Sequence, residues 1–358
     1  MTLYPHAVIN LEALKHNLEC VRKFAPNSKV MSVIKADAYG HGVTQIASAL
    51  IDSDAFAVAR LSEGVALRNA GFNHAITILE GVHTLAELQT AVEYQLAPVI
   101  HQPAHIEWLL NVTDLPYCWL MLETGMHRLG LPSKVISDAI ERLTSYRNKM
   151  GLMSHFANSD LYDDDRNFKQ IAVMHQLAEQ SGLPICMANS AAVINLPTSH
   201  GDWVRPGLML YGISPFADKT GADLGLKPVM QLKSTLIATQ VLAPGHEVGY
   251  GGEWTATEVC RMGVVSIGYG DGFNRQLSNA GQVMIRGVLV PVIGRVSMDT
   301  VCVLLKDCPD AVTGDEVVIW GHESLSVESQ AVRAKTIPYE LTTVLAGRVT
   351  RKYQNGQS

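Results

Sequence analysis

The chain has 358 residues, of which 47% are hydrophobic, and carries a formal net charge of −6. A chain of this length and apolar content buries a sizeable core and is long enough for two domains. Because the balance is acidic and no basic block is present, nothing directs the protein to nucleic acid or to an anionic membrane surface, and small solutes are the expected partners.

The beginning of the chain and its cysteines predict the cellular compartment. Residues 1–6 lack the basic and apolar regions of a signal peptide, and no uninterrupted apolar run approaches a transmembrane span. The six cysteines form no C-x-x-C pair and fall mostly in apolar, strand-like runs, where a free thiol behaves as a small hydrophobic group. We therefore expect a cytoplasmic protein with reduced cysteines and no metal site.

The first predicted element is a helix that Asn10 caps and that ends before Pro26. Short apolar runs then alternate with amphipathic stretches, the clearest of which spans residues 162–181. The apolar runs are residues 30–34, 55–59, 75–79, 96–100, 118–122, 151–156, 184–188 and 204–210. Eight strand-helix repeats of this kind predict an α/β fold, with a TIM-like (β/α)8 barrel over residues 1–225 and a doubly wound sheet as the alternative.

The pattern changes near residue 226. The pattern of residues 230–320 predicts strands without intervening helices, with hairpin turns at Arg286-Gly287 and Thr313-Gly314. A helical signal follows over residues 326–348. The sequence therefore predicts a second, mainly β domain over residues 226–358.

One amine stands at the end of the first predicted barrel strand. Lys35 follows the apolar residues 29–34 and precedes a Gly-rich turn. At the end of a core strand a lysine is desolvated, which lowers its pKa from the reference value of about 10.4 and makes the neutral amine available for Schiff-base chemistry. The alternative is a lysine with a buried stem whose ammonium group reaches solvent.

The catalytic side chains of a barrel come from the C-terminal ends of different strands. The candidate residues at or after the C-terminal ends of the predicted strands are Lys35, Arg128, His155, Asn189, Ser190 and Arg205. Ser190 offers a hydroxyl at a predicted helix start, and Gly207 and Leu208 offer backbone amides, which are donors that suit a phosphate group. Taken singly, the same residue types also occur as helix caps, strand-end histidines and surface ion pairs.

Three barrel segments resemble those of one enzyme family. V-I-K-A-D-A-Y-G-H-G at residues 33–42 resembles the cofactor-lysine motif of alanine racemases, fold-type III enzymes that use pyridoxal 5′-phosphate (PLP). Residues 203–212 are similar to the racemase R-P-G-x-x-x-Y-G segment, and residues 122–130 to its D-T-G-M-x-R-L-G segment. The likeness extends over essentially the whole chain, and it implies PLP as the cofactor, carried by Lys35.

The resemblance also implies roles for the other barrel residues. Arg205 would donate a hydrogen bond to the pyridine nitrogen of PLP with support from His155, and Arg128 would meet the cofactor 3′-oxygen and the substrate carboxylate. The residues expected at the cofactor phosphate and beside it are Tyr39, Asn189, Ser190, Gly207 and Leu208. Because an arginine keeps its proton, the ring is a weaker electron sink than a pyridinium, which makes transamination less favourable.

Three segments of the second domain resemble racemase segments as well. Tyr250 lies in V-G-Y-G-G, where the family has its second catalytic base, and Tyr269 lies in I-G-Y-G-D-G, where it has an entrance tyrosine. Met298 lies in G-R-V-S-M-D, where the methionine amide contacts the substrate carboxylate. In that family all three come from the other subunit of a head-to-tail dimer. The resemblance therefore implies a homodimer in which the β-rich domain contributes to the active site.

One position departs from the family pattern. Many members have a carbamylated lysine that fixes the substrate-binding arginine, whereas this chain has Met121. A thioether has no charge and accepts hydrogen bonds only weakly, so it cannot take over that role. We expect another acceptor to hold Arg128, namely Glu123, a backbone carbonyl or a solvent anion such as chloride.

The predicted function is PLP-dependent interconversion of L-alanine and D-alanine, which supplies D-alanine for cell-wall peptidoglycan. Inversion at Cα needs acid/base groups on both faces, and the family assigns Lys35 to the D-side proton and Tyr250 to the L-side proton. Three alternatives stay open: a racemase of broader range, a fold-type III decarboxylase of basic amino acids, and a non-catalytic PLP-carrier barrel. The decarboxylase would need a cysteine in its second site, and the carrier would lack the β-rich domain.

Overall fold

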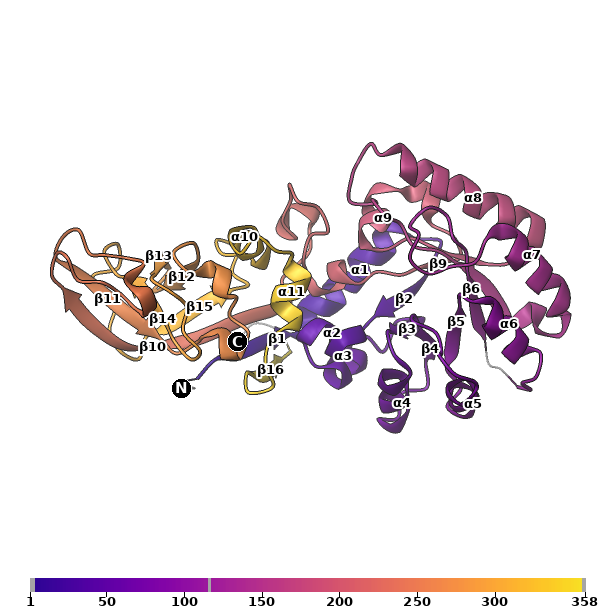
Figure 1. Ribbon diagram of the computed structural model, residues 1–358, viewed down its shortest axis with the longest axis horizontal. Helices are drawn as coiled ribbons and strands as arrows, with labels where there is room; N and C mark the ends of the chain where they lie inside the picture. Colours follow the sequence, from indigo (N-terminus) through magenta and orange to yellow (C-terminus); the bar gives the residue numbers. More distant parts are fainter. Residues whose placement is uncertain (1–3, 115–116, 356–358) are drawn as a thin grey trace.

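The computed structural model describes residues 4–114 and 117–355. Its strands form a closed barrel and a separate eight-stranded sheet. The two units lie side by side along the long axis of the molecule, with the sheet extending away from the barrel (Figure 1). Within the described residues, no helix is long and apolar enough to cross a membrane.

The barrel consists of eight strands in which every neighbouring pair is parallel. They are β2 (Lys29–Val33), β3 (Ala55–Val58), β4 (Ala75–Ile78), β5 (Ala97–Ile100), β6 (Cys118–Met121), β7 (Met150–Met153), β8 (Ile185–Cys186) and β9 (Trp203–Val204). Each lies within or beside one of the apolar runs, and β9 closes the barrel by pairing with β2. The predicted (β/α)8 barrel is confirmed, and the doubly wound sheet is excluded.

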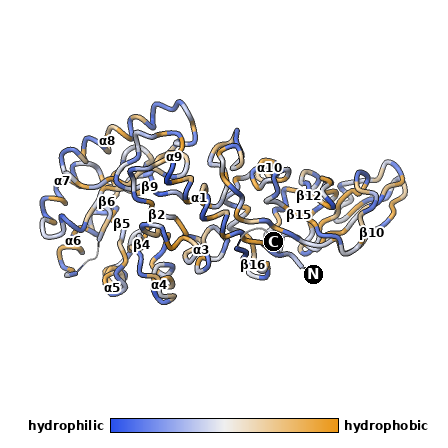
Figure 2. Tube along the Cα trace, turned by 180° about the vertical axis from the view of Figure 1, so that it is seen from behind, coloured by the Kyte–Doolittle hydropathy of each residue, from blue (hydrophilic) through white to orange (hydrophobic). Residues whose placement is uncertain are grey.

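The helices of the barrel domain lie between its strands along the chain, except the first helix, which precedes β2. They are α1 (Leu11–Phe24), α2 (Lys35–Gly40), α3 (Val43–Ala49), α4 (Leu61–Asn69), α5 (Leu85–Glu93), α6 (Pro103–Leu109), α7 (Ser133–Arg142), α8 (Asp165–Ser181) and α9 (Ser190–Asn195). The Asn10 side chain caps α1 by accepting from the Ala13 amide at 3.0 Å, as predicted. Asp164 caps α8 in the same way, and Gly182 ends it in the left-handed conformation. Figure 2 shows both hydrophilic and hydrophobic stretches along α7 and α8, as expected for helices that cover a barrel.

The second sheet has the strand order β11-β14-β13-β12-β15-β10-β1-β16. Its strands are β1 (His6–Asn10), β10 (Met230–Leu242), β11 (Cys260–Val265), β12 (Gln282–Ile285), β13 (Val288–Ile293), β14 (Val301–Leu304), β15 (Glu316–Trp320) and β16 (Thr350–Gln354). Two short helices, α10 (Val327–Arg333) and α11 (Pro338–Thr343), stand where the sequence predicts one helical stretch. Lys335 with φ 53° and Pro338 separate them, because neither position continues an α-helix.

Two expectations for this domain differ from the structure. The division at residue 226 counts the N-terminal segment with the barrel, whereas β1 pairs with β10 and β16 in the second sheet. The predicted turn at Arg286-Gly287 is a two-residue hairpin loop with both φ values positive, but Thr313-Gly314 makes no hairpin. It only precedes β15, whose partners are β10 and β12. Paired strands can lie far apart in the sequence, so local turn residues do not specify which strands pair.

The last strand reaches back to the loop that follows Lys35. Tyr353 in β16 donates from its hydroxyl to the His41 carbonyl oxygen at 3.0 Å, and Arg351 donates from Nε to the Gly40 carbonyl oxygen at 3.1 Å. A Cβ at Gly42 would lie 1.9 Å from the Tyr353 hydroxyl, so this approach requires glycine. The C-terminal strand thus anchors the segment that carries the candidate cofactor lysine.

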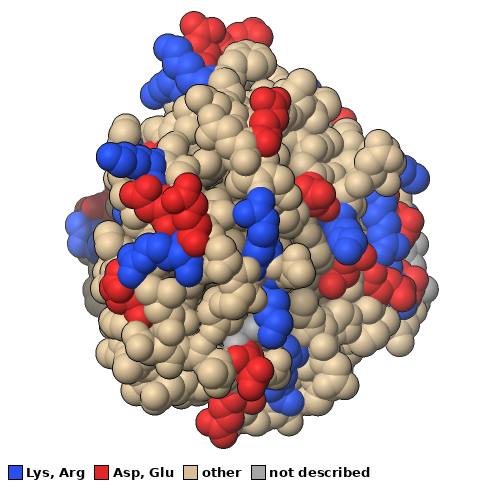
Figure 3. Space-filling model, turned by 90° about the vertical axis from the view of Figure 1, so that its right-hand side faces the viewer, with Lys and Arg blue, Asp and Glu red and all other residues tan. Residues whose placement is uncertain are grey.

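The surface and the cysteines match an ordinary globular protein. On the end face of the barrel domain, Lys and Arg side chains are interspersed with Asp and Glu (Figure 3). All six cysteines are unpaired, and Cys20, Cys118, Cys186 and Cys308 are buried. These four thiols act as small core side chains.

Candidate active site

Directly after Lys35 the chain makes a left-handed helical turn. Residues 36–39, none of them glycine, have φ values between 52° and 54°. This conformation costs roughly 1–2 kcal/mol per residue, so contacts outside the turn must hold it. The Glu63 carboxylate accepts from the Ala36 amide at 2.7 Å, and the Asp37 carboxylate accepts from the Val43 amide at 2.8 Å. These contacts and those from β16 fix the direction in which Lys35 leaves the barrel.

Lys35 lines a cavity of about 470 Å³ at the C-terminal end of the barrel strands. Arg128, His155 and Arg205 line the same cavity, each from a different strand end, as the barrel prediction requires. Burial lowers the pKa of the Lys35 amine, and the positive charges of Arg128 and Arg205 lower it further. Since the charged form is disfavoured, more of this amine is neutral at a given pH than in an ordinary lysine.

Arg205 is 4% exposed and is held by groups from two neighbouring strands. Its terminal nitrogens donate to the Ser154 carbonyl oxygen at 2.8 Å, to the Cys186 carbonyl oxygen at 3.3 Å and to Nδ1 of His155 at 3.1 Å. Burial and then the charge of Arg205 lower the pKa of His155 to about 3, so the imidazole is neutral and its Nδ1 accepts. Within the described residues, Nε of Arg205 has no acceptor. One donor of this fixed guanidinium is therefore available to a ligand.

Of the residues expected at a phosphate group, Tyr39, Ser190, Gly207 and Leu208 are buried and Asn189 is partly exposed. Ser190 Oγ accepts from the amides of Gly207 at 2.9 Å and Met209 at 3.2 Å. Asn189 caps α9 by accepting from the Ala192 amide at 3.0 Å. Leu208 begins the short 3-10 helix Leu208–Tyr211, so its amide has no partner inside that helix. The Ser190 hydroxyl thus joins the segment that follows β8 to the segment that follows β9.

Gly207 has no room for a side chain. A Cβ there would lie 2.5 Å from the hydroxyl of Tyr39, which is itself buried. We expect Gly207→Ala to destabilise the fold by about 1–3 kcal/mol through overpacking, and to weaken cofactor binding because Tyr39 must move. Urea unfolding and PLP titration measure the two effects. Gly347→Ala is the matched control, because a Cβ at Gly347 meets nothing within 4 Å; equal behaviour of both variants would contradict the prediction.

Arg128 lies exposed at the rim of the cavity, and Met121 lies buried in its wall. Among the residues that the structure describes, no side chain or carbonyl forms a hydrogen bond or ion pair with Arg128. Glu123 accepts instead from the amides of Gly125 at 2.5 Å and His127 at 2.9 Å, within its own loop. Of the three acceptors expected for Arg128, Glu123 is therefore committed elsewhere.

The structure does not bring the β-domain residues to this cavity within one chain. Tyr250, Tyr269 and Met298 are 71%, 44% and 54% exposed, and none of them lines it. The loops of Tyr269 and Met298 contact each other, since the Tyr269 amide donates to the Ser297 carbonyl oxygen at 3.0 Å. The Tyr250 loop packs beside Arg295 in the same segment as Met298. The site residues thus form two groups, one in the barrel and one on the exposed second domain.

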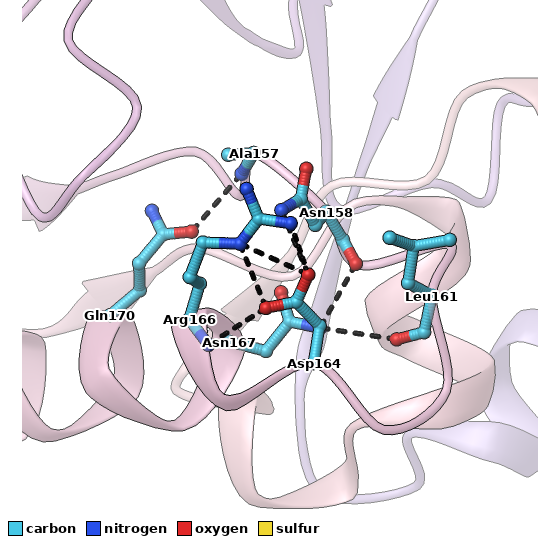
Figure 4. Close-up of polar contacts among 7 residues, drawn as sticks. All are labelled: Ala157, Asn158, Leu161, Asp164, Arg166, Asn167 and Gln170. Atoms are coloured by element: carbon cyan, nitrogen blue, oxygen red, sulfur yellow. Dashed lines mark hydrogen bonds and ion pairs between the residues drawn. The ribbon is translucent and has the colours of Figure 1, made fainter.

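Helix α8 supports the loop that follows His155. Asn167 donates to the carbonyl oxygens of Asn158 and Leu161, and Gln170 accepts from the Ala157 amide at 3.1 Å (Figure 4). The same Gln170 donates to the His155 carbonyl oxygen at 2.9 Å. The backbone of His155 is therefore fixed by the first turns of the helix.

Sequence reasoning missed several residues that shape the site. Glu63 is the third residue of α4, the usual place for a glutamate that accepts backbone amides at a helix start, so a capping signal could have found it. Tyr339 in α11 lies with its ring centroid 5.9 Å from that of Tyr39. No periodicity or spacing signals this contact, because α11 and the turn are about 300 residues apart in the chain.

The chain matches two family models and is similar to alanine racemases along nearly its full length. Residues 9–215 match the model described as the alanine racemase N-terminal domain, and residues 229–353 match the alanine racemase C-terminal domain. Alanine racemase of Nitrosococcus oceani is 46% identical over 353 residues, covering 97% of this chain and 99% of that protein. The biosynthetic alanine racemase of Escherichia coli is 41% identical, covering 97% and 98%.

Solved structures give the same result. Biosynthetic alanine racemase from Pseudomonas aeruginosa superposes with a TM-score of 0.94 at 38% identity, covering 99% of this chain and 100% of that one. Alanine racemase from Bartonella henselae, described with covalently bound pyridoxal phosphate, superposes with a TM-score of 0.90 at 28% identity, covering 99% and 100%.

Proposed function

Because the chain belongs to the alanine racemase family and is thus an isomerase, we propose that it interconverts L-alanine and D-alanine with PLP bound at Lys35. The observation that carries the proposal is the convergence of Lys35, Arg205 and Arg128 on one cavity, in a chain that matches racemases over nearly its full length. We also propose a cytoplasmic, biosynthetic role in which the product D-alanine supplies peptidoglycan. The E. coli relative described as biosynthetic supports that role.

The residues present suit PLP. The amine of Lys35 has a lowered pKa, as imine formation with an aldehyde requires. Arg205 offers its unpaired Nε to the pyridine nitrogen, and the hydroxyls of Tyr39 and Ser190 and the amide of Leu208 suit the phosphate. Gly207 has no side chain and so lets the hydroxyl of Tyr39 lie within 2.5 Å of where a Cβ would stand. When bound, PLP withdraws electrons from the substrate Cα and so makes its proton acidic.

Side chains of the protein position the cofactor, bind the substrate carboxylate and transfer the protons. Arg205 keeps its proton and therefore limits how strongly the ring accepts electrons, while neutral His155 holds the guanidinium in place. Arg128 binds the substrate carboxylate, assisted by the Met298 amide. The amine of Lys35 exchanges the proton on the D side of Cα, and the hydroxyl of Tyr250 exchanges the proton on the L side. Tyr269 lies at the entrance to the site.

This division of labour requires two subunits. Tyr250 is exposed on a domain that extends away from the barrel of its own chain and does not line the cavity of Lys35, which supports a site completed by a partner. We propose a homodimer in which the second domain of each subunit covers the barrel cavity of the other. The exposed group of Tyr250, Tyr269 and Met298 would then be buried against Lys35 and Arg128.

The direct test measures the interconversion of D and L forms for a panel of amino acids with the purified protein. Alanine should give the highest kcat/KM, and serine and basic amino acids should follow far behind. If a basic amino acid were racemised fastest, the enzyme would be a racemase of broader range. Release of carbon dioxide from a basic amino acid, without racemisation, would indicate the decarboxylase alternative.

A further prediction concerns Met121. Since no carbamylated lysine stands here, removing dissolved carbon dioxide should leave the rate unchanged, and replacing chloride by a bulky anion at fixed ionic strength should weaken alanine binding. Steady-state kinetics in degassed buffer checks both results. Met121→Lys is the matched variant, because it should gain activity on addition of bicarbonate. A wild-type rate that collapses without carbon dioxide and returns with bicarbonate would contradict the prediction.

A further inference from the structure

Arg348 joins the two exposed loops of the second domain that carry Tyr269 and Met298. It lies between α11 and β16. Its Nε pairs with the Asp271 carboxylate at 2.6 Å, and its Nη2 pairs with the Asp299 carboxylate at 2.7 Å. Asp271 ends the short 3-10 helix that begins at Tyr269, and Asp299 follows Met298 in the chain. One guanidinium group therefore spans both loops.

The contact with Asp271 fixes the Tyr269 turn from within. Asp271 is 4% exposed, and its other carboxylate oxygen accepts from the Gly268 amide at 2.9 Å. A buried carboxylate is stable only with a counter-charge and hydrogen-bond donors. Among the described residues, Arg348 supplies that counter-charge and Gly268 supplies the other donor. Loss of the guanidinium would therefore loosen the turn.

Backbone contacts hold the Tyr269 turn against the Met298 loop. The Gly270 amide donates to the Met298 carbonyl oxygen at 2.8 Å. A Cβ at Gly268 would lie 2.3 Å from the same oxygen, so this approach requires glycine. A Cβ at Gly270 would lie 2.7 Å from Nη2 of Arg348, so the guanidinium packs directly on the turn. No described group accepts a hydrogen bond from the Met298 amide, which leaves this donor free for a ligand.

We propose that Arg348 is a positioning residue for substrate binding, and that it acts on the cavity of the partner subunit and not on that of its own barrel. The proposal rests on the function and the shared site proposed above. Arg348 itself touches no substrate. It holds the Tyr269 turn and the Met298 loop in one arrangement, in which the Met298 amide is presented to the substrate carboxylate. A donor that is already in place binds without the cost of ordering its loop.

The segment of Arg348 also supports the cofactor turn of its own chain, which gives a second route to test. Arg351 donates to the Gly40 carbonyl oxygen, and the ring centroid of Tyr339 lies 5.9 Å from that of Tyr39. If Arg348 acted through these contacts, its loss would disturb the cavity of its own barrel. The two routes affect different cavities of a dimer, so they can be separated by mixing subunits.

Replacing Arg348 should change KM more than kcat. Arg348→Gln should raise the KM for alanine about five- to tenfold with kcat almost unchanged, because a contact with the substrate carboxylate is weakened in the ground state and the transition state alike. Arg348→Lys should recover part of the loss, since an ammonium group pairs with one carboxylate but lacks the fork that spans two. Arg286→Gln is the matched control. Arg286 is 47% exposed against 49% for Arg348, pairs with Asp315 at 2.7 Å, and lies in the hairpin loop between β12 and β13.

A second variant removes only the contact with the Met298 loop. Asp299→Asn leaves Asp271 paired with Arg348, so it tests the proposal even if Arg348→Gln folds poorly. It should raise KM about two- to fivefold, as for one weakened ion pair. Glu258→Gln is its control, because it breaks the equally exposed pair with Lys306.

Hydrogen exchange measures the positioning itself. In the PLP-loaded protein without substrate, residues 268–272 and 297–300 should exchange faster in Arg348→Gln than in Arg286→Gln. This measurement does not depend on the reaction that the protein catalyses. Equal exchange of the two variants would overturn the proposal.

Mixed dimers show which cavity Arg348 serves. Each is purified through a different affinity tag on each subunit, so that it contains one copy of either variant. Paired with Lys35→Ala, the Arg348→Gln subunit keeps Lys35 in its own barrel and receives an intact second domain, so the KM should be that of the wild type. Paired with Tyr250→Phe, the active cavity uses the second domain of the Arg348→Gln subunit, so the KM should stay raised.

The reverse pattern in the two mixed dimers would overturn the proposal, because Arg348 would then act on its own barrel. Equal KM values for Arg348→Gln and Arg286→Gln would overturn it as well. Both outcomes leave the proposed function standing, since they require an active racemase. The proposed function fails instead if the wild-type protein does not racemise alanine, which is measured without any variant.

Discussion

Replacing Lys35 with alanine is expected to reduce kcat/KM for alanine racemisation by at least about 10⁴-fold, because in the proposed mechanism one side chain supplies both the cofactor link and the D-side proton transfer. Visible absorption of the lysine-bound cofactor should disappear. Reduction of the wild-type protein with borohydride should fix the cofactor on one peptide, and mass spectrometry should identify it as the peptide that contains Lys35. The amine suits this role because burial and two arginines lower its pKa.

A matched control lies at the other end of the same strand. Lys29 begins β2, far from the cavity that Lys35 lines, and its ammonium lies 5.3 Å from the centroid of the Trp203 ring. Lys29→Ala should keep its absorption and most of its activity. If borohydride labels any other lysine, or if Lys35→Ala still racemises alanine at a wild-type rate, the assignment of the cofactor site to the end of β2 is wrong.

Replacing Tyr250 with phenylalanine is expected to lower racemisation about 10²- to 10⁴-fold, the range for loss of a general acid/base, while the cofactor stays bound. Only the L-side transfer is lost. In deuterated water, the variant should still exchange the α-proton of D-alanine, because Lys35 is intact, and should exchange that of L-alanine much more slowly. Proton NMR of each enantiomer measures this asymmetry. Tyr94→Phe, at the end of helix α5, should behave as the wild type.

Mixing the two inactive variants tests whether the site is shared. A heterodimer of Lys35→Ala and Tyr250→Phe subunits has one cavity that lacks both residues and one that retains both. We expect up to a quarter of the wild-type activity per dimer after random subunit exchange, since half of the dimers are mixed and each has one complete site. No recovery, with exchange demonstrated by native mass spectrometry, would mean that Tyr250 does not act on a partner.

The exposure of Tyr250 also accounts for the absence of the β-domain residues from the cavity within a single chain. The motifs carry the same resemblance in both domains, yet the structure assembles only the barrel residues around a cavity. The segments of Tyr250, Tyr269 and Met298 come together on a surface of their own. If the dimer proposal is correct, this surface is exposed only in the isolated subunit, and a covering barrel should protect it from hydrogen exchange in solution.

Much of the barrel and of its site could be predicted from local sequence. Short apolar runs that alternate with amphipathic stretches specify strands and helices because each pattern spans only a few residues. The same holds for the Asn10 and Asp164 caps and for the Arg286-Gly287 hairpin, where residue chemistry decides the backbone angles directly. The site residues Lys35, His155 and Arg205 follow from one rule, that parallel barrel strands present their C-terminal ends on one face.

Only the tertiary structure decided features that depend on distant partners. No local pattern indicates that β1 belongs to the second sheet, because its partners are residues 230–233 and 350–354. The left-handed turn after Lys35 is locally unfavourable and exists because Glu63, Arg351 and Tyr353 hold it from other elements. The sequence by itself thus determined which residues are the candidates for the chemistry, since residue type and strand-end position are local properties. The tertiary structure determined how those residues are oriented and supported, because that energy comes from contacts between segments far apart in the chain.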